Sequence, residues 1–407
     1  MQLKKLFTLS AAALLAAAPA KITAQTWQTV LDYQFTAGKY SVGEGIAVDG
    51  LGNVFSGGTG TDASGAAHGL VLKTDTTQVN WFLSDDSNPS PTQDKSYMYG
   101  VGVDASANVY SVGALAPNST GIPSWYVRKS LDSGLTWSTV DLYQYAAGKM
   151  AYAQDFTADN SGNIYAVGWG YDAGTKKTPS NIHWLVRKSA DGGKTWALVD
   201  DVPGQQACHA GFIPGVGVFV VGDANSAHPS WMVRRSLDAG ATWSTVDGPF
   251  AQSGASGVCG DSKGNIYVAG EQYIITQPAT KVTAAQGYYA WVTRKSSNGG
   301  ATWSTVDTFA YAPNKSAGAK GSGTDSAGNV VVVGYAIDAQ NRQHWIVRRL
   351  GLSGWLTVDD FQLAGYGGNA TATATDAAGN LLVTGFGIAP DSNGTLQYDW
   401  IARKLAP

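Results

Sequence analysis

Apolar residues along this chain occur in short runs, and each run ends at a cluster of Gly, Asn, Asp or Ser. The runs 152–158 and 164–168 flank a turn that reads Asp-Asn-Ser-Gly-Asn, and the runs 184–188 and 196–200 flank a second turn. Alternation with a period of two between turn residues predicts antiparallel β-hairpins. This part of the chain therefore predicts four consecutive strands.

Tryptophans mark the same pattern at regular intervals. Thirteen of the 14 tryptophans stand in the predicted third strands (Trp125, Trp184, Trp231, Trp291, Trp345, Trp400) or at the predicted fourth strands (Trp27, Trp81, Trp137, Trp196, Trp243, Trp303, Trp355). The second series has gaps of 47–60 residues. Self-similarity at such a period indicates a repeat array, and four strands per repeat are typical of a β-propeller blade.

The two ends of the array are complementary. Residues 26–32 predict a fourth strand with no third strand before it, and residues 400–404 predict a third strand with nothing after it. Pairing them closes the ring and removes its exposed edges. The sequence therefore predicts an all-β protein, a single seven-bladed β-propeller over residues 25–407 with four antiparallel strands per blade.

The N-terminus has the pattern of a signal peptide, residues 1–24. Lys4 and Lys5 precede an apolar stretch over 6–18, and cleavage is expected after Ala20 or Ala24. We therefore expect an exported protein, either secreted into the extracellular space or periplasmic. No other apolar run approaches the roughly 20 residues of a membrane span.

Composition narrows the possible partners. The net charge is −3 and no basic block is present, which argues against nucleic acid. No motif for a metal or cofactor appears, and a monomer is expected. Cys208 and Cys259 fall on neighbouring inner strands about three residues out of register, so two unbonded buried thiols are favoured over a disulfide.

The turns between the third and fourth strands carry a family resemblance. Residues 130–137, 189–196 and 236–243 share Ser-x-Asp-x-Gly-x-Thr-Trp, and 296–303 has Asn298 for the Asp. They resemble the Asp-box, or BNR repeat, of sialidases and of many non-enzymatic propellers. The resemblance implies a seven-bladed β-propeller of the exported bacterial type, with the boxes as structural hairpins. The Arg-Ile-Pro segment that accompanies the sialidase site is missing.

Residues that recur in nearly every blade are expected to be scaffold. Arginines recur in the third strands (Arg128, Arg187, Arg234, Arg294, Arg348, Arg403), and aspartates recur after the fourth-strand tryptophan (Asp85, Asp141, Asp200, Asp247, Asp307, Asp359, with Asp32 one residue later). The expected hairpin register places Asp141 opposite Trp125 and Lys129 opposite Trp137, as cross-strand pairs.

Function is expected where the pattern breaks. The position five residues before each first-turn aspartate differs in every blade: Glu44, Tyr99, Gln154, Cys208 (followed by His209), Ser256, Lys320 and Thr371. These residues either surround a small asymmetric ligand at the axis or only solvate a channel mouth. Aromatic residues on the loops, among them Trp169, Tyr273 and Tyr289, are expected to form a rim for a sugar or a peptide. They either bind ligand or pack onto their own loops.

Two functions remain open. The preferred one is a non-catalytic propeller that binds a glycan, a peptide or a partner protein through Glu44, Tyr99, Gln154, His209, Lys320, Trp169, Tyr273 and Tyr289. It rests on the lack of a coherent catalytic set in the sequence. The alternative is a glycoside hydrolase acting on an extracellular glycan, in which Glu44 and Asp155 form the pair of carboxylates that such chemistry needs.

Overall fold

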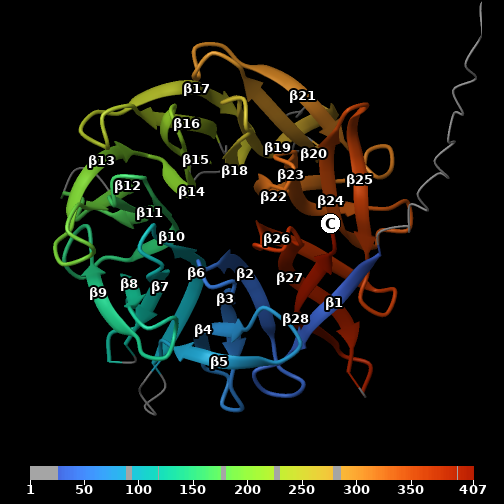
Figure 1. Cartoon of the computed structure of the whole chain (residues 1–407), viewed down its shortest axis with the longest axis horizontal. Helices are drawn as coiled ribbons and strands as arrows, with labels where there is room; N and C mark the ends of the chain where they lie inside the picture. The colour runs from blue at the N-terminus through green and yellow to red at the C-terminus, as the bar shows by residue number, and fades with distance from the viewer. Residues whose placement is uncertain are drawn as a thin grey trace, which may run out of the picture.

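The computed structural model of the chain describes residues 26–88, 94–117, 119–175, 180–223, 230–277, 286–391 and 393–407. These residues form β-strands and turns, and no helix long and apolar enough to cross a membrane is found among them. The expected signal peptide lies outside them. The strands make seven four-stranded antiparallel sheets around a central axis (Figure 1). The predicted fold class is confirmed.

Blades 1 to 7 are numbered here by their first strands in chain order, and each blade runs from the axis to the rim (Figure 1). The first strands are β2 (Ser41–Val48), β6 (Lys95–Val103), β10 (Ala151–Ala158), β14 (Gln206–Ile213), β18 (Ser253–Gly260), β22 (Ala317–Thr324) and β26 (Gly367–Thr375). The second strands are β3 (Val54–Thr61), β7 (Val109–Ala116), β11 (Ile164–Tyr171), β15 (Gly217–Asp223), β19 (Ile266–Gln277), β23 (Val330–Ile337) and β27 (Leu381–Pro390). The third strands are β4 (Ala67–Thr74), β8 (Ser124–Ser130), β12 (Ile182–Ser189), β16 (Ser230–Ser236), β20 (Gln286–Ser296), β24 (Gln343–Gly351) and β28 (Leu396–Leu405). The fourth strands are β5 (Trp81–Asp86), β9 (Ser138–Tyr143), β13 (Ala197–Pro203), β17 (Ser244–Ala251), β21 (Ser304–Phe309), β25 (Gly354–Phe361) and β1 (Trp27–Tyr33).

The ring closes as the complementary ends predict. Strand β1 pairs antiparallel with β28, and Trp27 lies opposite Leu405 while Tyr33 lies opposite Trp400. Blade 7 therefore takes its fourth strand from the start of the chain and its other three strands from the end.

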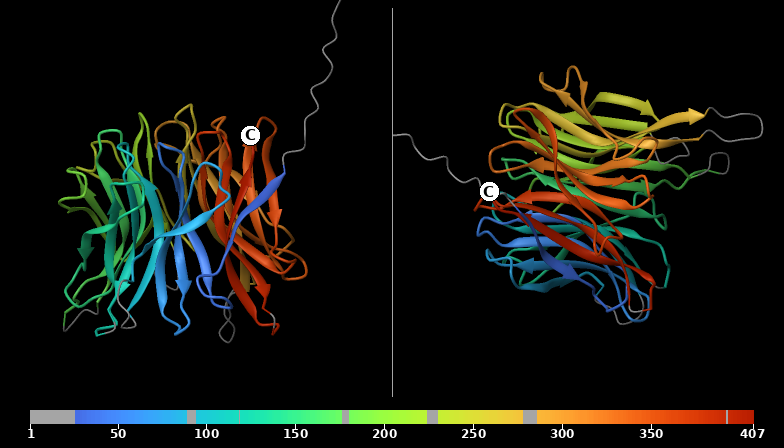
Figure 2. Two further views of the ribbon diagram at one scale, coloured as in Figure 1. Left: turned by 60° about the horizontal axis from the view of Figure 1, so that its bottom comes forward. Right: turned by 90° about the vertical axis from the view of Figure 1, so that its right-hand side faces the viewer.

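The Asp-box turns are held by their own side chains. Asp132 accepts hydrogen bonds from the Thr136 amide at 2.8 Å and from the Thr136 hydroxyl at 2.6 Å, while the Ser130 hydroxyl accepts one from the Gly134 amide at 2.7 Å. These hydrogen bonds lower the pKa of Asp132 to about 2. Because strands alternate in direction, the Asp-box turns share one face with the turns after the first strands. The opposite face carries the second-to-third connections, from which the β19–β20 hairpin projects furthest (Figure 2).

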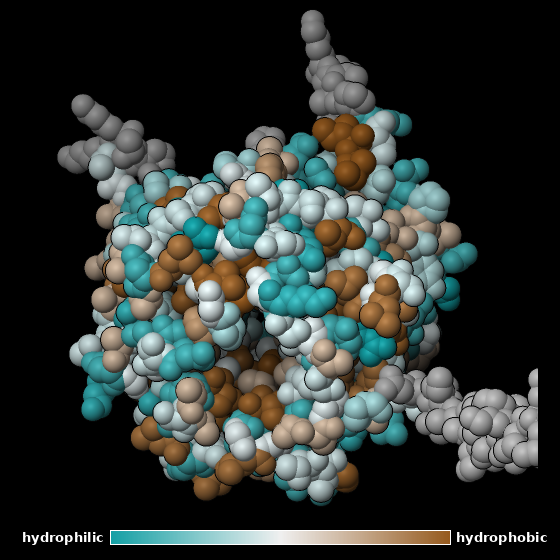
Figure 3. Space-filling model, turned by 45° about the horizontal axis from the view of Figure 1, so that its top comes forward, coloured by the Kyte–Doolittle hydropathy of each residue, from teal (hydrophilic) through white to brown (hydrophobic). Residues whose placement is uncertain are grey.

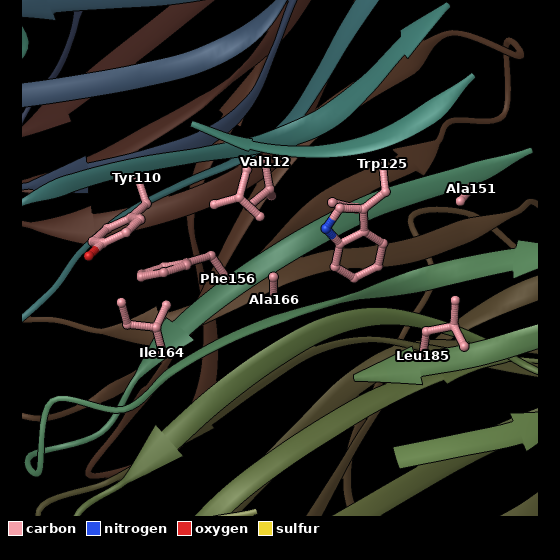
Figure 4. Packing of buried hydrophobic residues seen from close by; sticks show 10 residues of the cluster. Tyr110, Val112, Trp125, Ala151, Phe156, Ile164, Ala166 and Leu185 are labelled. Carbon is pink, nitrogen blue, oxygen red and sulfur yellow. The ribbon is translucent and has the colours of Figure 1, made fainter. Parts of the chain in front are cut away.

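Tryptophans of the third strands lock each blade onto the next. A Cβ atom added to Gly168 would lie 2.8 Å from Trp125 Cζ3 and 2.0 Å from the Tyr152 carbonyl oxygen, so only glycine allows the indole of the preceding blade to approach. Figure 4 shows Trp125 of blade 2 facing side chains of blade 3, including Ala166 and Leu185. The same contact recurs between Trp184 and Gly222, Trp231 and Gly270, Trp291 and Gly334, and Trp345 and Gly385.

Arginines of the third strands make the second repeated contact between blades. Arg187 donates to Asp141 of the preceding blade from Nε at 2.7 Å and from Nη2 at 2.9 Å, and both side chains are buried. The equivalent ion pairs are Arg128–Asp85, Arg234–Asp200, Arg294–Asp247, Arg348–Asp307 and Arg403–Asp359. The recurring charges are therefore scaffold, as their recurrence predicts.

The expected partners of these charges were wrong. Lys129 lies opposite Ser138 instead of Trp137, because the register is already one residue off at the turn, and a bulge between Val127 and Arg128 adds a second shift that places Asp141 opposite Val127 instead of Trp125. The carboxylate is thereby turned toward the next blade. An indole–carboxylate bond of the expected kind does occur in blade 4, where Trp231 Nε1 donates to Asp247 at 3.1 Å.

Leucines replace this ion pair where blade 7 meets blade 1. The strand registers place Leu72 at the arginine position and Leu31 at the aspartate position. Both leucines belong to a buried apolar cluster with Leu70 and Trp400. The grouping of Asp32 with the recurring aspartates was therefore wrong, since it lies one residue beyond that position.

Candidate active site at the propeller axis

Every first strand carries a β-bulge at the same level, and the bulge leaves one residue outside the pairing register. In blade 1 the register shifts between Gly43 and Gly45, so that Glu44 is the unpaired residue. A bulge locally kinks a strand and re-aims the side chain at that position. The seven unpaired residues are Glu44, Tyr99, Gln154, Cys208, Ser256, Lys320 and Thr371. They are the seven variable positions found in the sequence.

All seven line one cavity of about 400 Å³ at the centre of the ring. A further hollow of about 230 Å³ continues along the axis and shares Glu44, Tyr99, His209 and Thr371 with the cavity. The hollow at the centre of the ring is visible from outside in Figure 3. The cavity lies within the roughly 300–1,000 Å³ range typical of small-molecule sites. We refer to it below as the axial cavity.

A second set of residues enters the axial cavity from the second strands. Asp223 ends β15, Glu271 lies in β19, and each directly follows the glycine on which the preceding blade's tryptophan packs. The sequence-based search missed both carboxylates because it considered only the first strands. A signal was present, since the residue after this glycine also varies from blade to blade: Thr59, Ala114, Trp169, Asp223, Glu271, Tyr335 and Phe386.

Lys320 is the cation that faces these carboxylates. Its Nζ lies 3.4 Å from Glu271 Oε2 and 5.5 Å from the centre of the Tyr335 ring. Its charge also acts to lower the pKa values of Glu44 and Asp223. One lysine thus offsets part of the negative charge that three carboxyl groups bring into the axial cavity.

Burial outweighs the lysine at two of these carboxyl groups. It raises the pKa of Glu44 from 4.5 to about 7 against the pull of Lys320. Burial, and then repulsion from Glu271, raise the pKa of Asp223 to about 6. Desolvation disfavours the charged form, so both groups hold protons near neutral pH that ordinary carboxyl groups have lost. Carboxyl groups that differ in this way are suited to separate acid and base roles.

The expected carboxylate pair Glu44 and Asp155 shares only the deeper hollow. Asp155 Oδ2 accepts a hydrogen bond from the Ala210 amide at 2.9 Å and lies 3.4 Å from His209 Nδ1. The Asp155 carboxylate is therefore occupied by the first strand of the next blade. Its pairing with Glu44 in catalysis stays a prediction, whereas Glu271 and Asp223 line the axial cavity together with Glu44.

The expected rim residues pack against one another. The Trp169 ring stacks on Tyr152 with ring centres 4.3 Å apart, and Tyr273 and Tyr289 lie 5.1 Å apart as a cross-strand pair. Tyr289 also lies near Glu271, whose charge adds to burial in raising the pKa of Tyr289. Tyr289 of the rim thus lies close enough to Glu271 of the axial cavity to be affected by its charge.

Cys208 and Cys259 are both free, so no disulfide joins the two blades. Cys208 is the bulged residue of β14, and burial raises the pKa of its thiol. Within the described parts of the chain, no group of three or more His, Cys, Asp or Glu side chains is arranged to hold a metal ion.

Comparison with known proteins supports the fold. No protein-family model and no curated protein matches the sequence. Among solved structures, the GH74 xyloglucanase of Xanthomonas campestris is 15% identical with a TM-score of 0.56; the match covers 92% of this chain and 55% of the enzyme. A protein of unknown function from Dyadobacter fermentans is 12% identical with a TM-score of 0.48, covering 93% of this chain and 99% of that one. An α-L-arabinofuranosidase of Fusarium graminearum is 11% identical with a TM-score of 0.49, covering 94% and 97%. This chain thus spans about half the length of the xyloglucanase.

These findings correct the preferred function. At such identities the likeness shows the fold alone, a seven-bladed β-propeller that glycoside hydrolases also use. The non-catalytic interpretation rested on the absence of a coherent catalytic set, and the axial cavity brings together Glu44, Asp223, Glu271 and Lys320. The expectation of a purely binding protein was therefore wrong, and the findings favour its alternative, a glycoside hydrolase.

Proposed function

We propose that this protein is an exported glycoside hydrolase of the Asp-box type that cleaves an extracellular glycan in its axial cavity. The observation that carries the proposal is the set of three carboxyl groups around Lys320 in one cavity of about 400 Å³. Glycoside hydrolysis needs two such groups, one that gives a proton and one that is ionised.

Glu44 has the property of the general acid. With a pKa of about 7 it is largely protonated at slightly acidic pH, and it can give its proton to the oxygen of the departing sugar. Glu271, 3.4 Å from Lys320, is the candidate for the ionised partner. It either activates a water molecule or attacks the anomeric carbon, and the carboxyl separation in the substrate complex distinguishes the two routes.

Asp223 supports this division of roles. Its charge and that of Glu271 repel each other, and this repulsion contributes to raising the pKa of Asp223 to about 6. Below about pH 6 Asp223 is largely protonated and so limits the negative charge beside Glu271. Xyloglucan, the polymer in the name of the GH74 enzyme that shares this fold, is the first substrate to test, and arabinan is a second, neutral polymer.

The test is the release of reducing ends from xyloglucan, arabinan and a sialylated glycan by the mature protein, residues 25–407. We expect Glu44→Gln and Glu271→Gln each to lower turnover by about 10²–10⁴-fold without lowering the melting temperature. Ser256→Ala, a change at the same bulge position in blade 5, is the matched control and should keep most of the activity. Wild-type rates in both glutamine variants, or no release from any polymer, would contradict the proposal.

A further inference from the structure

A groove lies between blades 2 and 3. Its inner part is a hollow of about 320 Å³ lined by residues that include Tyr97, Met150 and Tyr152, and its outer part is a hollow of about 360 Å³ lined by Met150 and Tyr171 among others. Because Met150 borders both parts, the two hollows adjoin. We call them together the blade 2–3 groove.

Tyr99 connects this groove to the axial cavity. It lines the axial cavity, and its ring centre lies 6.2 Å from that of Tyr152 in the groove. Its pKa is raised by burial, by Tyr152 and by Glu44, so Tyr99 lies close to both the groove and the proposed acid. A ligand that reaches from the axial cavity to the groove would therefore pass the rings of Tyr99 and Tyr152.

The aromatic rings of the groove support one another. Trp169 stacks on Tyr152 at 4.3 Å with the planes 25° apart, and it meets Tyr171 edge-on at 6.0 Å. Trp169 thus braces Tyr152 in the inner hollow and Tyr171 in the outer one. Rigid aromatic side chains with a polar tip give a large contact area at low entropic cost, which suits a ligand with apolar faces and polar edges. A sugar ring has this character.

Charge decides which kind of sugar fits. Lys95, which is exposed, borders the inner hollow, and Lys149, which is partly exposed, borders the outer one, so salt screens their charges within about 8–10 Å. Glu44, Asp223 and Glu271 line the axial cavity together with Lys320, and two of them are shifted by burial. Charges in a desolvated site are screened less than exposed charges. Lys320, the one lysine or arginine among the described residues that line the axial cavity, already pairs with Glu271, so a sugar carboxylate would meet no free lysine or arginine there, which disfavours a charged sugar.

We infer that the blade 2–3 groove binds the continuing chain of an uncharged polysaccharide whose reacting sugar lies in the axial cavity. This inference rests on the proposed function for the role of the axial cavity, while the groove itself is a binding site whether or not the bond is cleaved. It makes the protein selective for polymers over short oligosaccharides.

The experiment measures binding to the full mature protein carrying Glu44→Gln, so that no ligand is consumed. The probes are disaccharides and longer oligosaccharides prepared from xyloglucan and from arabinan, with polygalacturonate as the charged polymer. We expect at least one neutral series to bind about tenfold more tightly as a long oligosaccharide than as its disaccharide. Polygalacturonate should bind more weakly than that series.

Met150→Asp places a charge between the two hollows, at a residue that is 42% exposed and so not needed for folding. It should remove the advantage of the long oligosaccharide while leaving disaccharide affinity unchanged, and Tyr171→Ala should reduce the advantage in part. Tyr366→Ala, at a tyrosine 51% exposed outside the groove, is the control and should change neither affinity.

Four outcomes separate the two proposals. Long chains that bind no better than disaccharides, or a Met150→Asp protein that keeps the advantage, overturn the groove. Tighter binding of polygalacturonate overturns its assignment to uncharged sugars. Length-dependent binding by a wild-type protein that cleaves nothing leaves the groove standing and removes the hydrolase. If Met150→Asp cleaves long chains at an unchanged KM, the hydrolase proposal stands and the groove is overturned.

Discussion

The blade interfaces and the axial cavity lie in one ring but use repetition in opposite ways. At the interfaces the same contacts recur: a tryptophan on a glycine, and an arginine on an aspartate. In the axial cavity, seven equivalent bulges carry seven different side chains, Glu44, Tyr99, Gln154, Cys208, Ser256, Lys320 and Thr371. Stability is thus supplied by residues that repeat, and chemistry by residues that do not.

The two regions meet at the second-strand glycines. Trp184 presses on Gly222 and Trp231 presses on Gly270, and the next residue in each case is an axial carboxylate, Asp223 or Glu271. The tryptophan–glycine contact serves only packing in some blades, but in blades 4 and 5 it also positions the carboxylate that follows the glycine. Sites supported by rigid elements hold their geometry better than sites on loops.

The largest effect is expected when a repeated ion pair loses one partner. Arg187→Ala leaves Asp141 buried without its two charged hydrogen bonds, which should lower the free energy of unfolding by about 3–5 kcal/mol. Chemical denaturation measures this loss. The activity per folded molecule should stay close to wild type, because Arg187 lies away from the axial cavity. A loss below about 1 kcal/mol would mean that the ion pair is solvated in solution, like a surface pair.

The next effect combines packing with function. Gly270→Ala brings a Cβ atom to 2.0 Å from the Gly254 carbonyl oxygen and 2.9 Å from Trp231, and Gly385→Ala brings one to 2.1 Å from the Asn369 carbonyl oxygen and 2.8 Å from Trp345. Both should cost about 3 kcal/mol of stability.

Only Gly270→Ala should also lower the rate of hydrolysis in the folded fraction, since Glu271 follows Gly270, whereas Phe386, which has no proposed role in the chemistry, follows Gly385. The hydrolysis rates of the two variants are compared at low temperature, where both variants are folded. Equal losses of rate would show that the glycine contact does not position the carboxylate.

The architecture could be predicted from the sequence because it depends on features that repeat. Turn residues, alternation and the tryptophan series each recur in nearly every blade, so an error in one blade is corrected by the others. The bulge residues were found for the same reason, since Glu44 and its equivalents keep a fixed distance from a recurring turn. Asp223 and Glu271 were missed because the expectation that only first strands face the axis excluded them.

The partners of the recurring charges could not be predicted from one blade. The turn and the bulge in the outer hairpin of blade 2 each shift the register by one position, so Asp141 lies opposite Val127 and its carboxylate pairs with Arg187 of the next blade. The alternation of apolar and polar residues with a period of two predicts neither a bulge nor a contact between blades. The leucines at the closing interface could not be predicted either. Asp32 is next to Leu31 in the sequence, so the pattern counts it as the recurring aspartate that Leu31 in fact replaces.

A smaller effect is expected from pH at the axial cavity. The pKa of Glu44 rises from 4.5 to about 7 on folding, so between these values the unfolded chain releases its proton first and stability falls as pH rises. The contribution of Glu44 amounts to roughly 2 kcal/mol across that window, and Glu44→Gln should remove it. Urea denaturation of both proteins from pH 4 to pH 8 measures the difference. In the wild type the rate of hydrolysis should also fall above about pH 7, as the acid is lost.

The smallest effect is expected when a repeated interface is rebuilt like the closing one. Asp141→Leu combined with Arg187→Leu copies the arrangement of Leu31 and Leu72, and neither a buried charge nor an unpaired donor remains. Replacing a buried ion pair with apolar side chains is often neutral or stabilising, so the double variant should lie within about 1 kcal/mol of wild type. The single change Arg187→Leu should be as harmful as Arg187→Ala, and the second leucine should restore most of the loss. If the double variant is as unstable as the single one, the repeated ion pairs orient neighbouring blades in a way that apolar packing cannot replace. The closing interface would then differ from the other six in more than its two leucines.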